Sequence, residues 1–561
     1  MVPLDQDARC GGVEMRERIG LLRGKGFDLG AYATRYPADE RCMVRLLADQ
    51  AAERGDATWL VFDGADELSF ADAHRLANRV AHAVIATTGA GAHVALFLRN
   101  QREFMPAFYG AMAAGGAAVP LNADARGPLL EYVIDRSDAR VLVARADLLE
   151  RLAELPSLGG VERVIVVGAG EGGLPASVSE APVERFEDWL AGRPEEPPGP
   201  PPAGHEVALI QFTSGTTGRS KGVVYPHQFL FLYSAMLTDP LGRTRDDVLT
   251  TPLPLFHVAA LHIIANSALH AGCTAHLKSR FSATAYWTQV AEDGATFSIL
   301  LGPMAAIILK QVHDAPEHRM RTMFCVPPPP GKEEFERRFD VTLLWQGYGM
   351  TEIYPLPMRP EMLDGPPTTI GHPVTWMEYG VVDEHDRLVG PGEPGQLVFR
   401  PLIPNAMAHG YYKDPEATVE AFRNFMFHTG DVATYDEDGC LHYRGRMQER
   451  IRRRGENISA LELELVTLRH PQVLEAAAFA VPGEFGEDDV KLDVVVKDEV
   501  DLGELHAWLV ENLPRFMVPR YVERRESFPK TPSERVEKYK LAAEGAERPG
   551  VLDADAARRP A

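Results

Sequence analysis

The sequence predicts an α/β protein: a large N-terminal domain with parallel α/β sheets and a small β-barrel-like subdomain, followed by a small α+β C-terminal domain. Apolar runs that alternate with helical patterns predict the parallel sheets, at residues 93–98, 139–144, 161–168 and 206–212. From about residue 380 the strands become shorter and turn signals more frequent, which is typical of an antiparallel sheet or small barrel. With 561 residues, of which 45% are hydrophobic, the chain is long enough for several compact units.

Breaks in this pattern suggest the domain boundaries. The proline cluster at 194–204 cannot form a helix or an inner strand, so we expect a surface loop there. The segment 449–459 is rich in charge and contains a glycine, and it reads as a hinge region. We therefore place a hinge at residues 447–450, between an N-terminal domain of residues 1–446 and a C-terminal domain of residues 451–561 with a helix at 502–512.

Composition excludes several classes of function. The net charge of −22 argues against non-specific binding to nucleic acid or to an anionic membrane. The five cysteines are scattered without a CxxC pair, which fits neither a disulfide framework nor a zinc site. The most apolar stretch, 255–272, contains three histidines and reads as a buried helix, and the first residues lack the apolar core of a signal peptide. We expect a soluble, cytoplasmic protein.

The strongest local signal is QFTSGTTGRSKGVVYPH at 211–227. A strand that ends at Phe212 is followed by glycines, hydroxyl residues and Lys221, and we expect a helix from about Tyr225. Glycines let backbone N–H groups turn towards an anion, hydroxyls add donors and lysine adds a mobile charge. The spacing differs from that of a Walker loop. We predict a phosphate-binding loop that includes Thr213, Ser214, Gly215, Thr216, Thr217 and Gly218.

This loop closely resembles the signature of the adenylate-forming superfamily, which includes acyl-CoA synthetases, luciferases and stand-alone peptide-synthetase adenylation domains. Further segments resemble that family's motifs in order: 113–122, 252–261, GYGMTE at 347–352, 395–412, 428–446, LPRFMVP and the final PKTPSER. The resemblance covers roughly residues 40–540. The segment GRMQERIRRRGENIS is most similar to medium-chain and carnitine-type CoA ligases.

The resemblance implies a reaction in two halves. A carboxylate attacks the α-phosphorus of ATP, with Mg²⁺ on the phosphates, to give acyl-AMP, and coenzyme A then displaces AMP. It also implies that Thr351 contacts the α-phosphate, that Glu352 holds Mg²⁺ and that Lys221 acts on the phosphates. The implied nucleotide site adds Gln346, Gly347, Tyr348, Gly349, Met350, Asp431 and Arg446, with Tyr348 on adenine and Asp431 at the ribose.

The remaining implied roles concern the acyl group and the thiol. His257 would gate the acyl pocket, where peptide-synthetase domains usually carry an aspartate, so an amino-acid substrate is not expected. Gly455, Glu456 and Asn457 would line the coenzyme A tunnel after the C-terminal domain rotates. Taken alone, His257 also fits a core histidine, 455–457 fits a tight turn, and Asp431 and Arg446 fit surface positions.

Four positions depart from the family pattern. Ser220 replaces a common proline, Gln448 replaces the usual hinge Asp or Lys, and VPPPPG at 326–331 replaces a glycine-rich stretch beside adenine. The family's final motif reads approximately PKTxxGK, but here Glu534 and Arg535 replace its last two residues. That lysine bridges the substrate carboxylate and the α-phosphate, so we predict impaired adenylation with thioester formation retained. Lys530 and Lys538 are possible substitutes.

Several alternatives remain open from the sequence. Arginine could be tolerated, which would leave a fully competent ATP-dependent acyl-CoA synthetase. The acceptor could be a carrier protein, or the chain could be a non-catalytic binder of nucleotide or acyl-AMP. An impaired enzyme would use acyl-AMP from a separate adenylating enzyme, or would adenylate slowly by itself. The arginine motif and the composition favour a bulky acid of secondary metabolism, such as the terpenoid-type acids of platensimycin and platencin.

Overall fold

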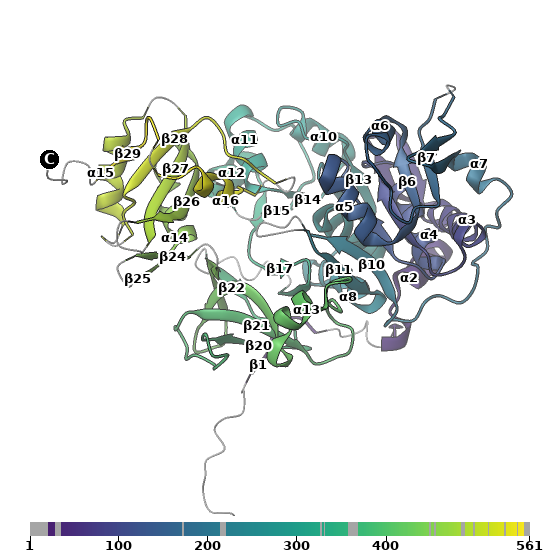
Figure 1. The fold of residues 1–561 in the computed structure, drawn as a ribbon, viewed down its shortest axis with the longest axis horizontal. Coiled ribbons are helices and arrows are strands. Elements are labelled where there is room, and N and C mark those ends of the chain that lie inside the picture. The colour runs from purple at the N-terminus through teal and green to yellow at the C-terminus, as the bar shows by residue number, and fades with distance from the viewer. Residues whose placement is uncertain are drawn as a thin grey trace, which may run out of the picture.

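The structure is a computed structural model that describes residues 21–28, 35–170, 173–213, 220–325, 328–329, 331–356, 368–447, 450–453, 456–483, 488–497, 500–513, 515, 517–531, 535–546 and 548–554. It shows a large α/β part followed by a smaller C-terminal domain (Figure 1). Within the described ranges, no helix has both the length and the apolar character that crossing a membrane requires.

The first lobe is built on an eight-stranded sheet whose centre is parallel, as predicted. All four apolar runs that predicted parallel strands lie in it. The sheet order is β11-β10-β5-β4-β6-β7-β9-β8. Its strands are β4 (His93–Phe97), β5 (Ala118–Pro120), β6 (Ala139–Arg145), β7 (Arg163–Val167), β8 (Ser177–Val178), β9 (Ala181–Arg185), β10 (Val207–Phe212) and β11 (Gly222–Pro226).

A second, seven-stranded sheet has the order β16-β15-β14-β12-β13-β2-β3, and all of its pairs are parallel except the edge pair β2–β3. Parallel strands are buried on both faces, which explains their continuous apolar runs. The strands are β2 (Thr58–Phe62), β3 (Asp66–Ser69), β12 (Val248–Thr251), β13 (Thr274–Leu277), β14 (Phe297–Leu300), β15 (Thr322–Cys325) and β16 (Thr342–Leu344).

One apolar core joins the two sheets through helices that lie between them. Buried residues of β4, β6, β2 and β12 share this core with α3 (Phe70–Thr88), α4 (Phe104–Ala113) and α8 (His227–Met236). Helix α4 is apolar on all sides, as a helix buried on all sides must be. Further helices complete the lobes: α2 (Met43–Arg54), α5 (Gly127–Ser137), α6 (Leu149–Ala153), α7 (Phe186–Leu190), α10 (Tyr286–Asp293), α11 (Gly302–Gln311) and α12 (Lys332–Phe339).

Two sequence predictions are confirmed in this part of the chain. The histidine-containing apolar stretch forms a buried π-helix, η4 (Ala259–Asn266), which continues into α9 (Ser267–Ala271). The proline cluster has no helix or strand and lies along α3, where the Asn78 amide donates to the Glu195 carbonyl oxygen at 2.7 Å.

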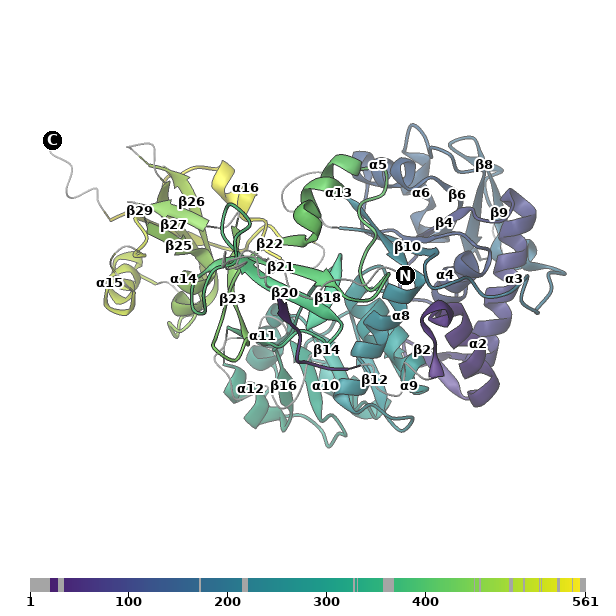
Figure 2. The same cartoon turned by 90° about the horizontal axis from the view of Figure 1, so that it is seen from below.

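The subdomain is a six-stranded antiparallel sheet with the open order β1-β20-β21-β22-β23-β19. The sequence allowed either an antiparallel sheet or a small barrel, and the structure shows the sheet. The short strand β1 pairs with β20 from the other end of the N-terminal part (Figure 2). The strands of the subdomain are β1 (Leu22–Arg23), β19 (Thr369–Gly371), β20 (Met377–Val382), β21 (Gly395–Pro401), β22 (Phe427–Tyr435) and β23 (Leu441–Arg446). Helix α13 (Pro415–Ala421) lies between β21 and β22 in the sequence.

The C-terminal domain has its own apolar core around a four-stranded sheet of order β26-β27-β28-β29. Helix α15 (Leu502–Asn512) spans the predicted residues. The other elements are β24 (Arg450–Arg453), β25 (Glu456–Ser459), α14 (Ala460–Thr467), β26 (Val473–Pro482), β27 (Asp488–Val496), β28 (Tyr521–Arg525), α16 (Lys538–Ala543) and β29 (Leu552–Asp553).

Candidate active site

The glycine-rich loop connects two antiparallel strands, β10 and β11. Phe212 pairs with Gly222, and the Thr213 amide donates to the Lys221 carbonyl oxygen at 3.0 Å, which closes the base of the loop. The Tyr132 hydroxyl fixes the same end by donating to the Ser220 carbonyl oxygen at 3.2 Å. The predicted loop residues Ser214, Gly215, Thr216, Thr217 and Gly218 lie outside the described residues.

The helix expected near Tyr225 is present as α8 and begins two residues later, at His227, because Tyr225 itself lies in β11. The β-branched and aromatic residues Val223, Val224 and Tyr225 pair with the end of β10, and such residues suit a strand. The strand ends at Pro226, which then becomes the N-cap of α8.

The GYGMTE segment forms a β-hairpin whose turn presents Thr351 and Glu352. Strand β17 (Tyr348–Met350) pairs with β18 (Ile353–Leu356), and the Tyr225 hydroxyl donates to the Thr351 carbonyl oxygen. This bond ties the hairpin to β11, at the base of the glycine-rich loop. A Cβ atom at Gly349 would lie 2.1 Å from the Tyr354 ring, so only glycine fits there.

Glu352 is a buried carboxylate, 6% exposed, that lies near two predicted site cations. Its Oε1 accepts a hydrogen bond of 2.7 Å from the Tyr411 hydroxyl, and Lys221 Nζ lies 4.8 Å from the centre of the Tyr411 ring. Burial raises the pKa of Glu352, while Tyr411, Arg446 and Lys221 oppose that rise. A hard carboxylate oxygen in this setting fits Mg²⁺, which would supply charge neutralisation at the phosphates.

Tyr348, Asp431 and Arg446 form a linked group beside this hairpin. The Tyr348 hydroxyl donates to Asp431 Oδ2 at 2.5 Å, and Arg446 Nε lies 3.2 Å from Asp431 Oδ1. Asp431 and Arg446 are cross-strand partners in β22 and β23, which explains their proximity despite fourteen intervening residues. Neither is a solitary surface residue, because Asp431 is buried and Arg446 is partly buried.

The buried amide of Gln346 indicates which kind of ligand the predicted nucleotide site would accept. The residue is 2% exposed, and neither its Nε2 nor its Oε1 has a hydrogen-bond partner among the described residues. A buried amide without partners is unfavourable, so a ligand with both donors and acceptors would satisfy it. An adenine edge has that chemistry. Next to it, Gly347 adopts a φ of +143°, and Met350 is partly buried.

His257 lies just before the π-helix η4, and its Nε2 is buried without a hydrogen-bond partner among the described residues. Burial, together with the nearby Arg535 guanidinium, lowers the pKa of His257 to about 4. The ring is therefore neutral at neutral pH. The Arg535 guanidinium of the C-terminal domain is therefore within electrostatic range of His257.

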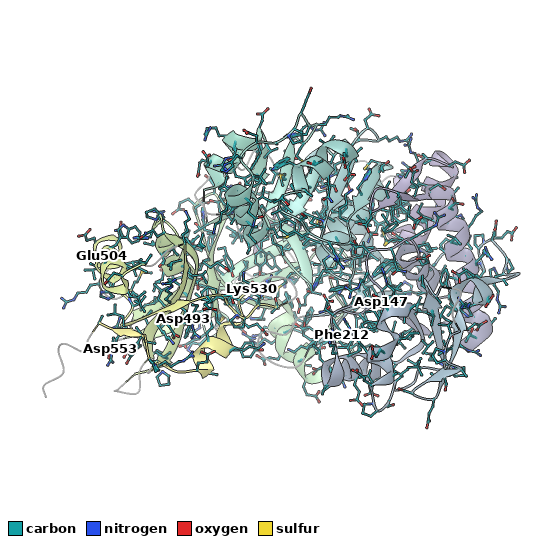
Figure 3. The ribbon with its side chains drawn as sticks, turned by 90° about the horizontal axis from the view of Figure 1, so that it is seen from above. Asp147, Phe212, Asp493, Glu504, Lys530 and Asp553 are labelled. Carbon is teal, nitrogen blue, oxygen red and sulfur yellow. The ribbon has the colours of Figure 1, made fainter. Side chains whose placement is uncertain are left out.

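Bonds to the segment just before it position Arg535. Lys530 and Val536 form a β-bridge, and the Arg535 amide donates to Thr531 Oγ1 at 3.2 Å. Lys530 Nζ lies 2.6 Å from Glu475, and Lys538 Nζ lies 2.8 Å from Glu464. Both lysines therefore pair within their own domain, with Lys530 at the edge that faces the rest of the molecule (Figure 3).

The predicted thiol-tunnel segment lies elsewhere in this conformation. Glu456 and Asn457 belong to β25, whose hairpin with β24 is drawn well apart from β17 (Figure 1). Gly455, the predicted hinge residue Gln448 and Glu534 lie outside the described residues, as do Val326, Pro327 and Pro330 of the proline run.

Sequence reasoning missed several aromatic residues around the site. Tyr411 belongs to a recognised motif, yet its bond to Glu352 depends on two segments 59 positions apart. Beside η4, the Tyr233 ring lies 4.6 Å from that of Tyr354 and 4.8 Å from that of His262. No local spacing pattern signals such a cluster, because its members come from three separate elements.

Comparison with known proteins identifies the family of the chain. The family model for AMP-binding enzymes matches residues 47–412, and the model for the AMP-binding enzyme C-terminal domain matches residues 462–535. The chain is 30% identical to an oxalate–CoA ligase of Arabidopsis thaliana, over 91% of this chain and 100% of that protein. It is 29% identical to a crotonobetaine/carnitine–CoA ligase of Salmonella arizonae, over 88% of this chain and 97% of that protein.

Solved structures share the fold. An anthranilate CoA ligase in complex with anthranoyl-AMP superposes with a TM-score of 0.81 at 22% identity, covering 91% of this chain and 98% of that one. A benzoate CoA ligase from Burkholderia xenovorans superposes with a TM-score of 0.77 at 23% identity, over 89% and 99% of the two chains. The matched family model spans more than half of the sequence, and the chain belongs to the AMP-binding enzyme family as an acyl-CoA ligase of the adenylate-forming superfamily.

Proposed function

We propose that this acyl-CoA ligase forms its thioester efficiently from an acyl-adenylate but makes the adenylate from ATP poorly. The observation that carries the proposal is that Arg535 stands where the family's final motif has its lysine, within electrostatic range of His257. We infer that residue 535 reaches the proposed acyl pocket in this orientation, where the family's lysine would act on the reacting carboxylate.

Arginine is a poor replacement for lysine at such a point. An ammonium group is compact and can bridge two oxygens of different groups, whereas a guanidinium is planar, bulkier and rigid. Losing one preorganised contact in the transition state typically lowers the rate by about 10²–10³-fold. Lys530 and Lys538 are held by Glu475 and Glu464, so neither is directed to the site in this conformation.

We assign the remaining roles by motif and position. Lys221 and Thr351 act on the phosphates, Glu352 holds Mg²⁺, and the residues from Gln346 to Met350 contact adenine together with the glycine-rich loop. Asp431 binds the ribose with Arg446 beside it. His257 stands at the acyl group, and it binds no amino group because its ring carries no negative charge.

The second half-reaction requires the C-terminal domain to rotate about a hinge at residues 447–450 that includes Gln448. In the described orientation Arg535 is near His257, whereas the hairpin that contains Glu456 and Asn457 is apart from β17. Rotation would exchange these segments, bringing Gly455, Glu456 and Asn457 to the thiol. Because Arg535 would then leave the site, its identity should not affect thioester formation.

The substrate we propose is a bulky acid of secondary metabolism, with a terpenoid-type acid as the first choice, and a separate adenylating enzyme would supply acyl-AMP. The test compares two mixtures on a panel of such acids. One contains acid, ATP, Mg²⁺ and coenzyme A, and the other contains preformed acyl-AMP and coenzyme A. We expect product mainly from the adenylate, and an Arg535→Lys variant should recover about 10²-fold or more of the ATP-dependent rate.

Arg515→Lys is the matched control, because Arg515 is an exposed arginine of the same domain. It should leave both rates unchanged. Equal wild-type rates in the two mixtures would contradict the proposal and identify a fully competent synthetase. Product only with a phosphopantetheinyl carrier protein would show that the acceptor is that protein and not coenzyme A. Ligand binding without any turnover would indicate a non-catalytic binder.

A further inference from the structure

Three potential metal ligands meet at the tip of the β22–β23 hairpin, outside the nucleotide site. Asp436, Cys440 and His442 each offer one ligand atom, and these atoms lie within 4.8 Å of one another. The tip is about 17 Å along β22 from Asp431, at 3.4 Å per residue. Figure 2 shows β22 and β23 side by side in the subdomain. We propose that this cluster is a binding site for a thiophilic divalent metal ion such as Zn²⁺.

The imidazole is already oriented as a metal ligand. His442 Nδ1 forms a hydrogen bond of 3.2 Å with Thr369 Oγ1, on the neighbouring strand β19. When Nδ1–H donates to this oxygen, the lone pair is on Nε2, which faces Asp436 Oδ2 at 3.5 Å. A second hydrogen bond of this kind fixes the tautomer and ring position of most metal-binding histidines.

The carboxylate is also held in place, with one oxygen left for a ligand. Asp436 Oδ1 accepts from the backbone N–H groups of Asp438 at 3.0 Å and Cys440 at 2.9 Å. These bonds fix the turn and leave Oδ2 directed at His442. The remaining partner of that oxygen in the described structure is the imidazole, at an ion-pair distance that a metal ion could bridge.

The thiol completes the set. Cys440 is partly buried and offers its sulfur to the same point as Asp436 and His442. The tip itself is rigid, because Gly439 adopts a φ of +80° and the Tyr379 hydroxyl donates to its carbonyl oxygen at 2.5 Å. The sequence alone gave no sign of a zinc site, because the usual pattern pairs cysteines, whereas here single Asp, Cys and His residues combine.

The chemistry of this donor set indicates which ion would bind. Thiolate and imidazole ligands favour Zn²⁺ and related ions over Mg²⁺ and Ca²⁺, which prefer oxygen. Three protein ligands leave a fourth position for water. Binding releases the thiol proton, because the thiolate is the form that coordinates metal. The alternative is a metal-free turn in which Asp436 caps the backbone and pairs with His442.

Cobalt(II) provides a direct test on the full-length protein after removal of metal with a chelator. We expect a thiolate-to-cobalt charge-transfer band in the near ultraviolet, saturating at about one ion per chain and disappearing when Zn²⁺ is added. Cys440→Ser should abolish the band. Thr369→Val should weaken Co²⁺ and Zn²⁺ binding by about 10–100-fold, because it removes the bond that orients His442.

His385→Gln is the control, since His385 is exposed on the same subdomain and should not affect binding. Thermal unfolding of each metal-free variant checks that it is folded, and Zn²⁺ should raise the midpoint of the wild type but not of Cys440→Ser. Absence of the band in the folded wild type would overturn the proposal. An unchanged band in folded Cys440→Ser would also overturn it by locating the metal at another cysteine.

Discussion

Glu352 combines two properties that usually exclude each other, because it is a buried carboxylate and yet must be charged to hold a cation. The neighbouring groups resolve this conflict. Tyr411 donates to one oxygen at 2.7 Å, and Lys221 and Arg446 stabilise the charged form against desolvation. The Lys221 ammonium lies over the ring of the same tyrosine. Tyr411 therefore contacts both the Glu352 carboxylate and the Lys221 cation.

Tyr411→Phe separates these two contributions, because it removes the hydroxyl but keeps the ring beneath Lys221. A hydrogen bond to a charged group contributes about 1.5–3 kcal/mol, so we expect adenylation to slow by roughly 10–100-fold and to require more Mg²⁺. The measurement is pyrophosphate release as a function of Mg²⁺ concentration. Tyr435→Phe is the control, because the Tyr435 hydroxyl donates to the Val389 carbonyl oxygen. Equal effects of the two variants would contradict the assignment.

The charged residues of the site could be predicted from the sequence, whereas the neutral side chain that contacts them could not. Lys221, Glu352 and Arg446 come from separate motifs, and the structure places both cations within electrostatic reach of the carboxylate. Their catalytic roles remain predictions. Tyr411 could not be identified in advance, because the need for a donor at Glu352 becomes visible only when the burial of that carboxylate is known.

Among the elements, Arg535 is held by bonds to the segment just before it. Thr531 contributes two of them: its amide donates to the Arg535 carbonyl oxygen at 2.8 Å, and its hydroxyl accepts from the Arg535 amide. Flanking residues Lys530 and Val536 form an isolated bridge. The position of residue 535 therefore depends on this hydroxyl as well as on the orientation of the whole domain.

Thr531→Ala should loosen the turn and slow the ATP-dependent half-reaction by about fivefold, since a net hydrogen bond contributes about 1 kcal/mol. Thioester formation from preformed acyl-AMP should not change, because under the proposed mechanism Arg535 leaves the site before that step. Thr531→Ser keeps the hydroxyl and should restore the rate. Equal losses in both half-reactions would indicate a general effect on folding instead.

Strand β11 shows a limit of sequence reasoning about elements. From the sequence we expect a helix near Tyr225 but no strand before it, whereas β11 runs from Gly222 to Pro226 and α8 follows at His227. The decisive information is the pairing of β11 with β10 across the glycine-rich loop. Pairing between strands is non-local, whereas the parallel strands β4, β6 and β7 were predicted because each is a continuous apolar run.

At the scale of the whole molecule, buried histidines make stability sensitive to acid. Burial lowers the pKa values of His227, His262 and His270 to about 3 each. The unfolded chain takes up protons below about pH 6.5, whereas the folded chain does not until far lower pH. The stabilisation is therefore complete above pH 6.5 and is lost as the pH falls towards 3.

We expect the free energy of unfolding to fall by about 1.4 kcal/mol per pH unit for each of these histidines below about pH 6. Urea unfolding at pH 7 and pH 5 measures the total. His270→Leu should reduce the pH dependence by roughly one third of this contribution, whatever its effect on stability at pH 7. His385→Gln, at a side chain 66% exposed, should leave it unchanged. The same slope in His270→Leu would refute the prediction.

Strand β1 also has a consequence for the synthesis of the molecule. Leu22 pairs with Tyr379, so the first described strand to leave the ribosome waits for a partner made about 350 residues later. At 5–20 residues per second that interval is on the order of 20–70 s. Both lobes have time to form before β20 is available to pair with β1. The β1–β20 contact can thus form only after the glycine-rich loop and the β17–β18 hairpin have been made, but before β22 and β23 supply Asp431 and Arg446.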